Sequence, residues 1–173
     1  MNKLVINYQK YKTLVQTICR DISIDAWRPD YVVGITRGGL LPAVMISHYF
    51  KIPCHTLHVS LRDGDGTNES NLWMAEDAFG YDKNYKTNIL LIDDINDTGS
   101  TFNWIINDWH SSCSPGDPRW ESIWNNNVRF GVVVDNLSSK CNYKMDYAGM
   151  EINKEENDVW VDFPYEDWWS KTE

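Results

Sequence analysis

The chain has 173 residues, of which 42% are hydrophobic and 24% charged, and this size and composition are typical of one globular domain. Its net charge of −9 argues against a nucleic-acid partner, because proteins that bind nucleic acid normally present a basic face to the phosphates. No apolar run approaches the roughly 20 residues that a membrane-spanning helix needs, so we expect no membrane partner either.

The first part of the chain alternates between strand and helix patterns. Apolar residues at helical spacing predict an amphipathic helix over residues 8–22, and a short β-branched run predicts a strand at 31–35. A Gly-rich turn then leads into a predicted helix at 40–50, and alternating residues indicate a strand at 54–61. This order of strand, turn, helix and strand is a βαβ unit, which implies parallel pairing.

The second part begins with a long polar segment. Residues 62–86 are rich in Gly, Asn and Asp, so we expect a loop there. The later elements predicted are a buried strand at 88–93, a helix at 100–110, a loop at 111–127, a core strand at 128–135 and short strands within 144–152 and 158–169. Together these elements predict an α/β fold with a mainly parallel central sheet flanked by helices and a small C-terminal hood.

Cysteine usage and the N-terminus indicate the compartment. The four cysteines are widely spaced, with no Cys-x-x-Cys pair, which is typical of reduced thiols. The first residues, MNKLVINYQKYK, lack the apolar core of a signal peptide. We therefore expect a cytoplasmic protein.

Two acids at the end of a buried strand give the first functional signal. Asp93 and Asp94 follow the apolar run Ile-Leu-Leu-Ile, at the end of a strand where ligands of open α/β sheets bind. Alternation along a strand should send the two side chains to opposite sides, so that one can face a ligand while neighbouring backbone donors can hold the other. Carboxylates suit vicinal hydroxyls, which donate hydrogen bonds, and Mg²⁺, which prefers oxygen ligands.

The next five residues, from Asp97 to Thr101, open a predicted helix. Gly99 allows a tight turn, and the hydroxyls around it, together with the free N–H groups of a helix start, favour a bound anion. An ordinary helix cap would explain Thr98 or Ser100 alone, but it leaves the preceding acid pair unexplained. Acids for a diol or metal beside an anion cradle predict a site for a phosphorylated sugar.

The stretch ILLIDDINDTGSTF, residues 89–102, resembles the phosphoribosyl-pyrophosphate (PRPP) signature of type I phosphoribosyltransferases. VVGITRGGLLPA, residues 32–43, resembles the loop that receives pyrophosphate, which in this family often carries a non-proline cis peptide bond. The tail, with MDYAGMEI and VWVDFPYEDWW, resembles the ending of the xanthine/hypoxanthine/guanine branch. The resemblance implies one phosphoribosyltransferase domain over residues 1–173, with a mobile lid near 61–87 and a base-binding hood near 136–173.

The resemblance also implies an activity. Such an enzyme of purine salvage transfers the 5-phosphoribosyl group from PRPP to a 6-oxopurine base (guanine, xanthine or hypoxanthine) and releases pyrophosphate, with Mg²⁺ as cofactor. Because family members are often dimers or tetramers, we expect a homo-oligomer. Two alternatives remain: an enzyme that uses a pyrimidine or another acceptor, and a non-catalytic regulator that senses PRPP. The WVDFP ending argues against the first, and Asp97 with the long polar segment argues against the second.

Position by position, the resemblance implies a role for each site residue. Asp93 and Asp94 would bind the ribose hydroxyls, with Asp94 also beside Mg²⁺, and Asp97 would be the catalytic proton acceptor near N7 of the base. The 5-phosphate would be bound by Thr98, Gly99, Ser100 and Thr101, and the leaving pyrophosphate by Thr36, Arg37, Gly38 and Gly39. Trp160 would stack on the base, and Val161 would offer backbone contacts to the edge of the base.

The sequence departs from the family pattern at two places. The family usually has a Lys after the strand at 128–135 to contact the purine 6-oxo group, whereas this chain has Asn136 there and Lys140 four residues later. Both side chains can donate a hydrogen bond, and we favour Lys140 slightly because the loop length leaves the alignment open. Residues 60–62 replace the Ser-Tyr pair of purine-branch lids, so Arg62 would either contact pyrophosphate or be an ordinary surface side chain.

Overall fold

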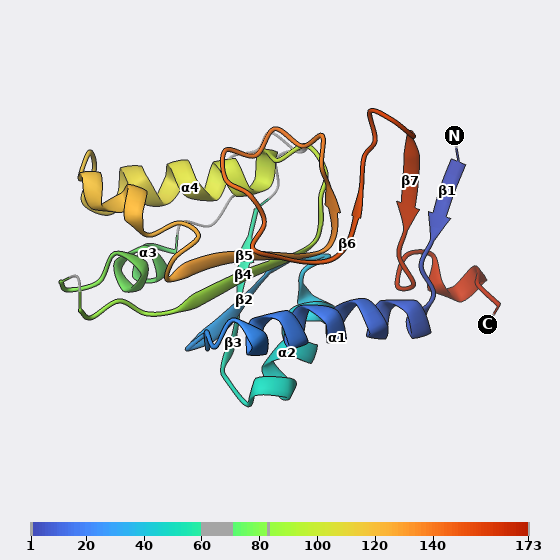
Figure 1. Cartoon of the computed structure of the whole chain (residues 1–173), viewed down its shortest axis with the longest axis horizontal. Coiled ribbons are helices and arrows are strands. Elements are labelled where there is room, and N and C mark those ends of the chain that lie inside the picture. The colour runs from blue at the N-terminus through green and yellow to red at the C-terminus, as the bar shows by residue number, and fades with distance from the viewer. Residues whose placement is uncertain (1, 60–70, 83, 173) are drawn as a thin grey trace.

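A five-stranded parallel sheet forms the centre of the fold, as Figure 1 shows. The computed structural model describes residues 2–59, 71–82 and 84–172. Within these residues, the strands of this sheet are, in spatial order, β3 (Cys54–His58), β2 (Tyr31–Thr36), β4 (Ile89–Asn96), β5 (Val128–Asn136) and β6 (Tyr147–Ile152).

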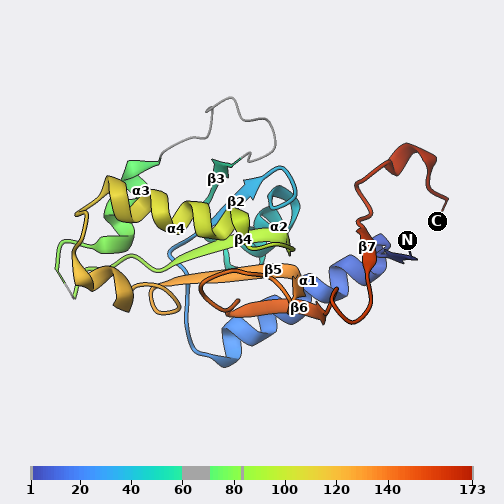
Figure 2. The ribbon, with the colours of Figure 1, turned by 90° about the horizontal axis from the view of Figure 1, so that it is seen from above.

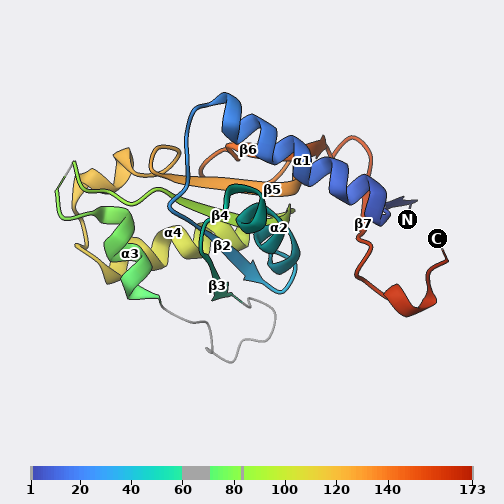
Figure 3. The same cartoon turned by 90° about the horizontal axis from the view of Figure 1, so that it is seen from below.

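Helices cover both faces of this sheet. Figure 3 shows one face with α1 (Tyr8–Ile24) and α2 (Leu40–Phe50), and Figure 2 shows the other with α3 (Leu72–Phe79) and α4 (Ser100–Ser112). A parallel sheet covered on both faces needs strands that are apolar throughout, and Ile89 to Ile92 of β4 are fully buried. The predicted α/β fold with a parallel sheet is therefore confirmed.

The two faces of the sheet carry separate apolar cores. Beneath α1 and α2 the core is mostly aliphatic, with Ile18, Ile22 and Ile46 fully buried. Beneath α3 and α4 it is aromatic, and a short 3-10 helix, η1 (Pro118–Ser122), adds Trp120 to it. The rings of Trp120 and Trp124 stack in this second core, so these tryptophans have a packing role.

Both ends of the chain build the hood, which comprises residues 2–5 and 159–172; β6, although within the predicted range of 136–173, belongs to the central sheet. Strand β7 (Val159–Asp162) pairs in parallel with β1 (Asn2–Val5), and a short turn, η2 (Trp168–Ser170), follows near the C-terminus. Figure 1 shows both termini at this end of the molecule. The sequence analysis did not predict β1, because four mostly exposed residues carry no clear strand pattern.

Several element boundaries differ from the predicted ones. Part of the predicted loop at 62–86 is helix α3, which buries Met74, Ala75, Ala78 and Phe79 on one face. Strand β4 continues three residues past its predicted end, because β5 keeps pairing with it as far as Asn96. Residues 60–70 and 83 lie outside the described residues, so the lid and the role of Arg62 stay predictions. None of the described helices could cross a membrane.

The histidine of the aromatic core predicts a pH effect on stability. The Trp124 indole donates from Nε1 to Nε2 of His110 at 2.7 Å, and burial lowers the pKa of His110 below its usual value. Because the unfolded chain then binds the proton more readily, the free energy of unfolding should fall as the pH drops below about 6.5 toward the folded-state pKa.

We predict that His110→Gln reduces this loss, because the glutamine oxygen can accept the indole bond and does not titrate. Urea denaturation at pH values of about 7.5, 6.5 and 5.5 measures the effect. Equal losses in the wild-type and variant proteins would contradict the prediction.

Candidate active site

The site lies where β2 and β4 separate. These strands pair in parallel only as far as Gly34 opposite Ile92, after which β2 turns into the loop at 36–39 while β4 continues along β5. Because α2 and α4 leave toward opposite faces, the two strand ends open a crevice at the topological switch point of the sheet. A cavity of about 1020 Å³ lies there.

Most of the predicted site residues line this cavity. They are Thr36, Arg37, Gly38, Asp93, Asp94, Asp97, Thr98, Gly99, Ser100, Thr101, Trp160 and Val161. Both Asp93 and Asp94 border the cavity. Past Ile92 no β2 residue pairs with the edge of β4 that faces β2, so the end of β4 borders the cavity. Gly39, Asn136 and Lys140 do not line the cavity.

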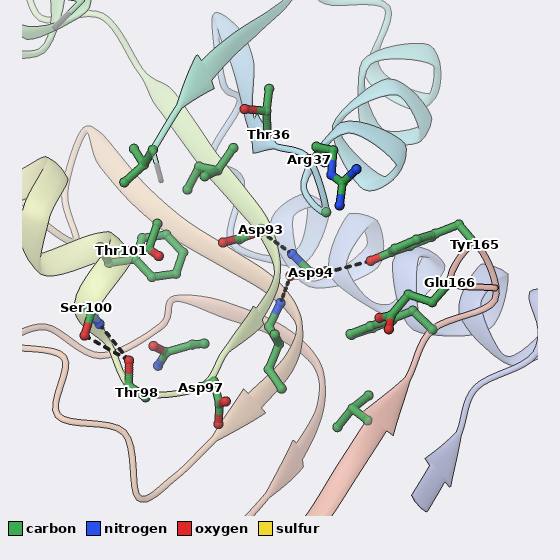
Figure 4. Close-up of a pocket in the computed structure, with 18 of the residues that line it drawn as sticks. Thr36, Arg37, Asp93, Asp94, Asp97, Thr98, Ser100, Thr101, Tyr165 and Glu166 are labelled. Atoms are coloured by element: carbon green, nitrogen blue, oxygen red, sulfur yellow. Dashed lines mark hydrogen bonds between the residues drawn. The ribbon is translucent and has the colours of Figure 1, made fainter. Parts of the chain in front are cut away.

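The acid pair is held by short hydrogen bonds. The backbone N–H of Asp94 donates to Asp93 Oδ1 at 2.8 Å, and the N–H of Ile95 donates to Asp94 Oδ1 at 2.7 Å. The Tyr165 hydroxyl donates to Asp94 Oδ2 at 2.7 Å, as Figure 4 shows. Burial, followed by the neighbouring Asp94, raises the pKa of Asp93 well above its usual value. Hydroxyl donors or a cation would relieve the repulsion between the two acids.

The turn before α4 has the form of an anion site. Gly99 adopts φ 91°, and a side chain there would overlap the backbone of Cys141, so only glycine fits. Gly99 is the N-cap of α4 and has no side chain to cap the helix, and the Thr98 hydroxyl accepts the N–H of Ser100, the first residue of α4, at 3.3 Å. Beside it, the Thr98 hydroxyl donates to Ser100 Oγ at 3.0 Å, which keeps both hydroxyls together at the cavity (Figure 4).

The loop after β2 forms the opposite wall. The peptide bond between Thr36 and Arg37 is cis, as the resemblance implied, and Thr36 Oγ1 hydrogen-bonds to Nδ1 of His58 at 2.8 Å. A side chain at Gly38 would overlap the Asp94 carboxylate, so this glycine lets the loop and the acid pair lie together. A side chain at Gly39 would overlap the backbone of β4 at Ile92, so this residue packs against the sheet and does not face the cavity.

A lysine that the sequence analysis missed stands beside Asp97. Lys154 Nζ lies 2.9 Å from Asp97 Oδ1, and its side chain is only 17% exposed. Lys154 follows the end of β6, and the rule that ligands bind at the carboxyl ends of parallel strands could have identified it. By contrast, the Lys140 side chain is 84% exposed and lies 4.0 Å from Glu155 on the surface.

Asn136 supports Asp97 and Lys154 from behind. It is 4% exposed, and its Nδ2 donates to the carbonyl of Asp97 at 2.8 Å. Its Oδ1 accepts the backbone N–H of Lys154 at 3.0 Å. Since both ends of the amide bond to the backbone, Asn136 positions the two charged residues and is not itself presented to a ligand in the cavity.

The cavity is acidic overall. Among the described residues that line it, five are acids (Asp93, Asp94, Asp97, Glu166 and Asp167) and two are cations (Arg37 and Lys154). The acids at 166 and 167, together with the aromatic residues Phe163, Tyr165 and Trp169, come from the hood and were not predicted as site residues. No three His, Cys, Asp or Glu side chains in the described ranges are arranged to hold a metal by themselves.

One switch point of a parallel α/β sheet thus combines an acid pair, a helix start flanked by hydroxyls and a carboxylate–ammonium pair. This arrangement is suited to a polar, phosphorylated ligand. The family is the phosphoribosyl transferase domain family, whose model matches residues 6–168, and the chain belongs to it.

Two solved structures and one curated protein illustrate the relationship. The chain is 24% identical over 124 residues to xanthine phosphoribosyltransferase 1 of Saccharomyces cerevisiae, covering 61% of this chain and 59% of the yeast protein. It therefore spans about three fifths of the length of that relative. A purine phosphoribosyltransferase from Pyrococcus horikoshii superposes with a TM-score of 0.65 at 18% identity, covering 95% of this chain and 94% of the other. The xanthine-guanine-hypoxanthine phosphoribosyltransferase of Helicobacter pylori also gives a TM-score of 0.65, at 15% identity and coverages of 95% and 93%.

Because Gly38 lies against Asp94, we predict that any side chain at position 38 lowers the stability of the protein. Gly38→Ala should displace the Asp94 carboxylate and lower the free energy of unfolding by about 1–3 kcal/mol, the usual cost of overpacking. The control is Gly131→Ala, where the added methyl group would first meet Ile92 Cδ1 at 3.0 Å and the loss should be smaller. Urea denaturation compares the variants, and a larger loss for Gly131→Ala would contradict the prediction.

Proposed function

We propose that this protein transfers the 5-phosphoribosyl group from PRPP to a 6-oxopurine and releases pyrophosphate. The observation that carries the proposal is the Asp97–Lys154 pair, at 2.9 Å, in the same cavity as the acid pair and the anion-binding turn. Family membership and the likeness to a xanthine phosphoribosyltransferase support the reaction class. A cytoplasmic location and a homo-oligomeric state stay predictions.

The sugar phosphate binds across the two strand ends. The turn at 98–101 receives the 5-phosphate, because hydroxyls and helix-terminal amides favour an anion there. Asp93 and Asp94 accept hydrogen bonds from the ribose hydroxyls. Arg37, with the neighbouring Thr36 and Gly38, binds the pyrophosphate on the opposite wall.

The acid pair also fits Mg²⁺. The described residues offer no complete protein cage, and Mg²⁺ characteristically binds through one or two carboxylates together with substrate phosphates. Asp94, with Asp93 beside it, supplies such carboxylates, and the acidic lining of the cavity favours a cation. When bound, Mg²⁺ would neutralise charge that develops on the leaving pyrophosphate.

The base half of the cavity has the donor and acceptor pattern of a 6-oxopurine. On such a base, N7 and the 6-oxo oxygen stand side by side on one edge. Asp97 and Lys154 also stand side by side, so the carboxylate takes a proton at N7 while the ammonium donates to the oxygen. Adenine carries an amino donor at that position, which an ammonium cannot accept. Trp160, which is 45% exposed and lines the cavity, stacks on the ring, and Val161 offers backbone groups to its edge.

The reaction breaks the bond between ribose C1 and the pyrophosphate oxygen, which keeps the electron pair. Positive charge develops on the ribose, and N9 of the base attacks C1 to form the new bond. Asp97 removes or shares the proton that the base must lose, and Arg37 stabilises the negative charge on the departing pyrophosphate. Each of these groups lines the same cavity.

A base panel tests the proposed activity and its alternatives. We expect turnover of PRPP with guanine, xanthine or hypoxanthine, and much slower turnover with adenine, orotate and uracil. Asp97→Asn should lower turnover by about 100-fold or more, the usual contribution of a positioned base, while calorimetry still detects PRPP binding. Binding of PRPP without turnover of any base would favour the regulator, and turnover with orotate or uracil would favour the other acceptor class.

Lys154 and Lys140 give a matched pair of variants for base selection. Lys154→Met removes the ammonium from the cavity and should raise the KM for the 6-oxopurine by about 10-fold or more, as expected for a lost hydrogen bond from a charged donor. Lys140→Met removes an exposed ammonium and should leave this KM near the wild-type value. The assignment of Lys154 would be wrong if only the Lys140 variant changed the KM.

A further inference from the structure

A hydroxyl group from the hood reaches the acid pair on β4. Tyr165 lies three residues after β7, and its Oη donates to Asp94 Oδ2 at 2.7 Å. Figure 4 shows the tyrosine ring extending from the hood segment toward Asp94. The contact therefore joins the part of the molecule that holds the base to the carboxylate assigned to the ribose and the metal.

Buried packing holds the tyrosine ring in place. The rings of Tyr165 and Phe163 stack with centres 5.6 Å apart and planes 2° apart. Tyr11 of α1 meets both rings edge-on, with centre separations of 6.0 Å to Tyr165 and 6.3 Å to Phe163. Tyr11 and Phe163 are each only 1% exposed. The Tyr165 hydroxyl is thus presented to Asp94 from a fixed direction.

Asp94 is held from three directions. Its Oδ1 accepts the N–H of Ile95 within β4, and its Oδ2 accepts the hydroxyl of Tyr165 from the hood. The third neighbour is Gly38, whose missing side chain leaves space for the carboxylate against the loop after β2. Strand β4, the hood and the pyrophosphate-side loop therefore meet at this one carboxylate.

Polar contacts between the hood and the main sheet are few. Within the described part of the chain, Tyr165 makes the one hydrogen bond that joins the segment after β7 to the five-stranded sheet. Lys171 bonds back onto the hood, to Asp162 Oδ1 at 2.7 Å, and Phe163 packs by apolar contact. A hydrogen bond is directional, whereas apolar packing is not, so the bond to Asp94 sets how the hood lies over the cavity.

We propose that Tyr165 is a positioning residue that couples the two substrate subsites, because by holding Asp94 it fastens the hood, and with it Trp160, over the sugar-phosphate half of the cavity. This inference rests on the proposed function for the identity of the ligand at Asp94. A ligand that fixes the Asp94 carboxylate also fixes the acceptor of the Tyr165 bond, so PRPP binding tightens the hood. PRPP binding should therefore increase the affinity for the base. Reciprocity then requires the bound base to increase the affinity for PRPP by the same factor.

Phenylalanine at position 165 would keep the stacked ring and remove only the link to Asp94. The matched control is Tyr31→Phe, because the Tyr31 hydroxyl also donates to a carboxylate, Asp77 Oδ2, at 2.8 Å, and neither Tyr31 nor Asp77 lines the cavity. Both variants lose one tyrosine–aspartate hydrogen bond, so a general loss of stability affects both, whereas a specific loss of coupling affects Tyr165→Phe alone.

Hydrogen exchange measured by mass spectrometry, with and without Mg²⁺ and PRPP, tests the coupling. In the free protein we expect the β7 amides to exchange about 10-fold faster in Tyr165→Phe, the scale of a lost hydrogen bond to a charged acceptor, and at the wild-type rate in Tyr31→Phe. PRPP should slow β7 exchange in the wild-type protein and in Tyr31→Phe, but not in Tyr165→Phe.

Three results would count against these inferences in distinguishable ways. Wild-type exchange of β7 in free Tyr165→Phe would overturn the fastening role of the hydroxyl. Normal slowing of β7 exchange by PRPP in Tyr165→Phe would overturn the coupling. If calorimetry shows no binding of PRPP to the wild-type protein, the proposed function fails, and the free-protein comparison still decides whether Tyr165 fastens the hood.

Discussion

The site depends on the point at which β2 and β4 stop pairing. Their ladder ends at Gly34 and Ile92, and β4 then runs on beside β5, with no strand of the described residues paired to its other edge. The backbone N–H and C=O groups on an unpaired strand edge can bond to side chains and ligands, because no neighbouring strand uses them. Both acids of the pair lie on this edge, and the loops at 36–39 and 97–99 diverge from it, so every other feature of the cavity follows from that separation.

Electrostatics explains why the cavity suits a substrate that carries both anionic groups and hydroxyls. Adjacent carboxylates in a partly buried place raise the free energy of the ligand-free protein, as the raised pKa of Asp93 indicates. Hydroxyl donors and a divalent cation would relieve that cost, and in the proposed function Arg37 and the start of α4 receive the phosphates. Lys154 compensates the charge of Asp97 directly, so a carboxylate and an ammonium stand side by side in the cavity.

The hood unites segments from opposite ends of the sequence. Strand β1 and strand β7 pair in parallel, and Tyr11 of α1 packs edge-on against both Phe163 and Tyr165. The positions of Trp160 and Tyr165 above the cavity are therefore set by the N-terminal strand and helix as well as by the tail. Through Tyr165 the same hood touches Asp94, so the hood and the end of β4 are joined at the cavity.

The sequence by itself determined the fold class, most elements of the central sheet and the strand-end motif, because hydrophobic periodicity and local turn chemistry depend on near neighbours in the chain. Only the tertiary structure decided which distant side chains complete the site. Asn136 turned inward to hold backbone groups and Lys140 lies on the surface, while Lys154 and Tyr165 reach the acids from β6 and the hood. Such contacts join residues between 57 and 71 positions apart, from Asp97 to Lys154 and from Asp94 to Tyr165, and no local pattern specifies them.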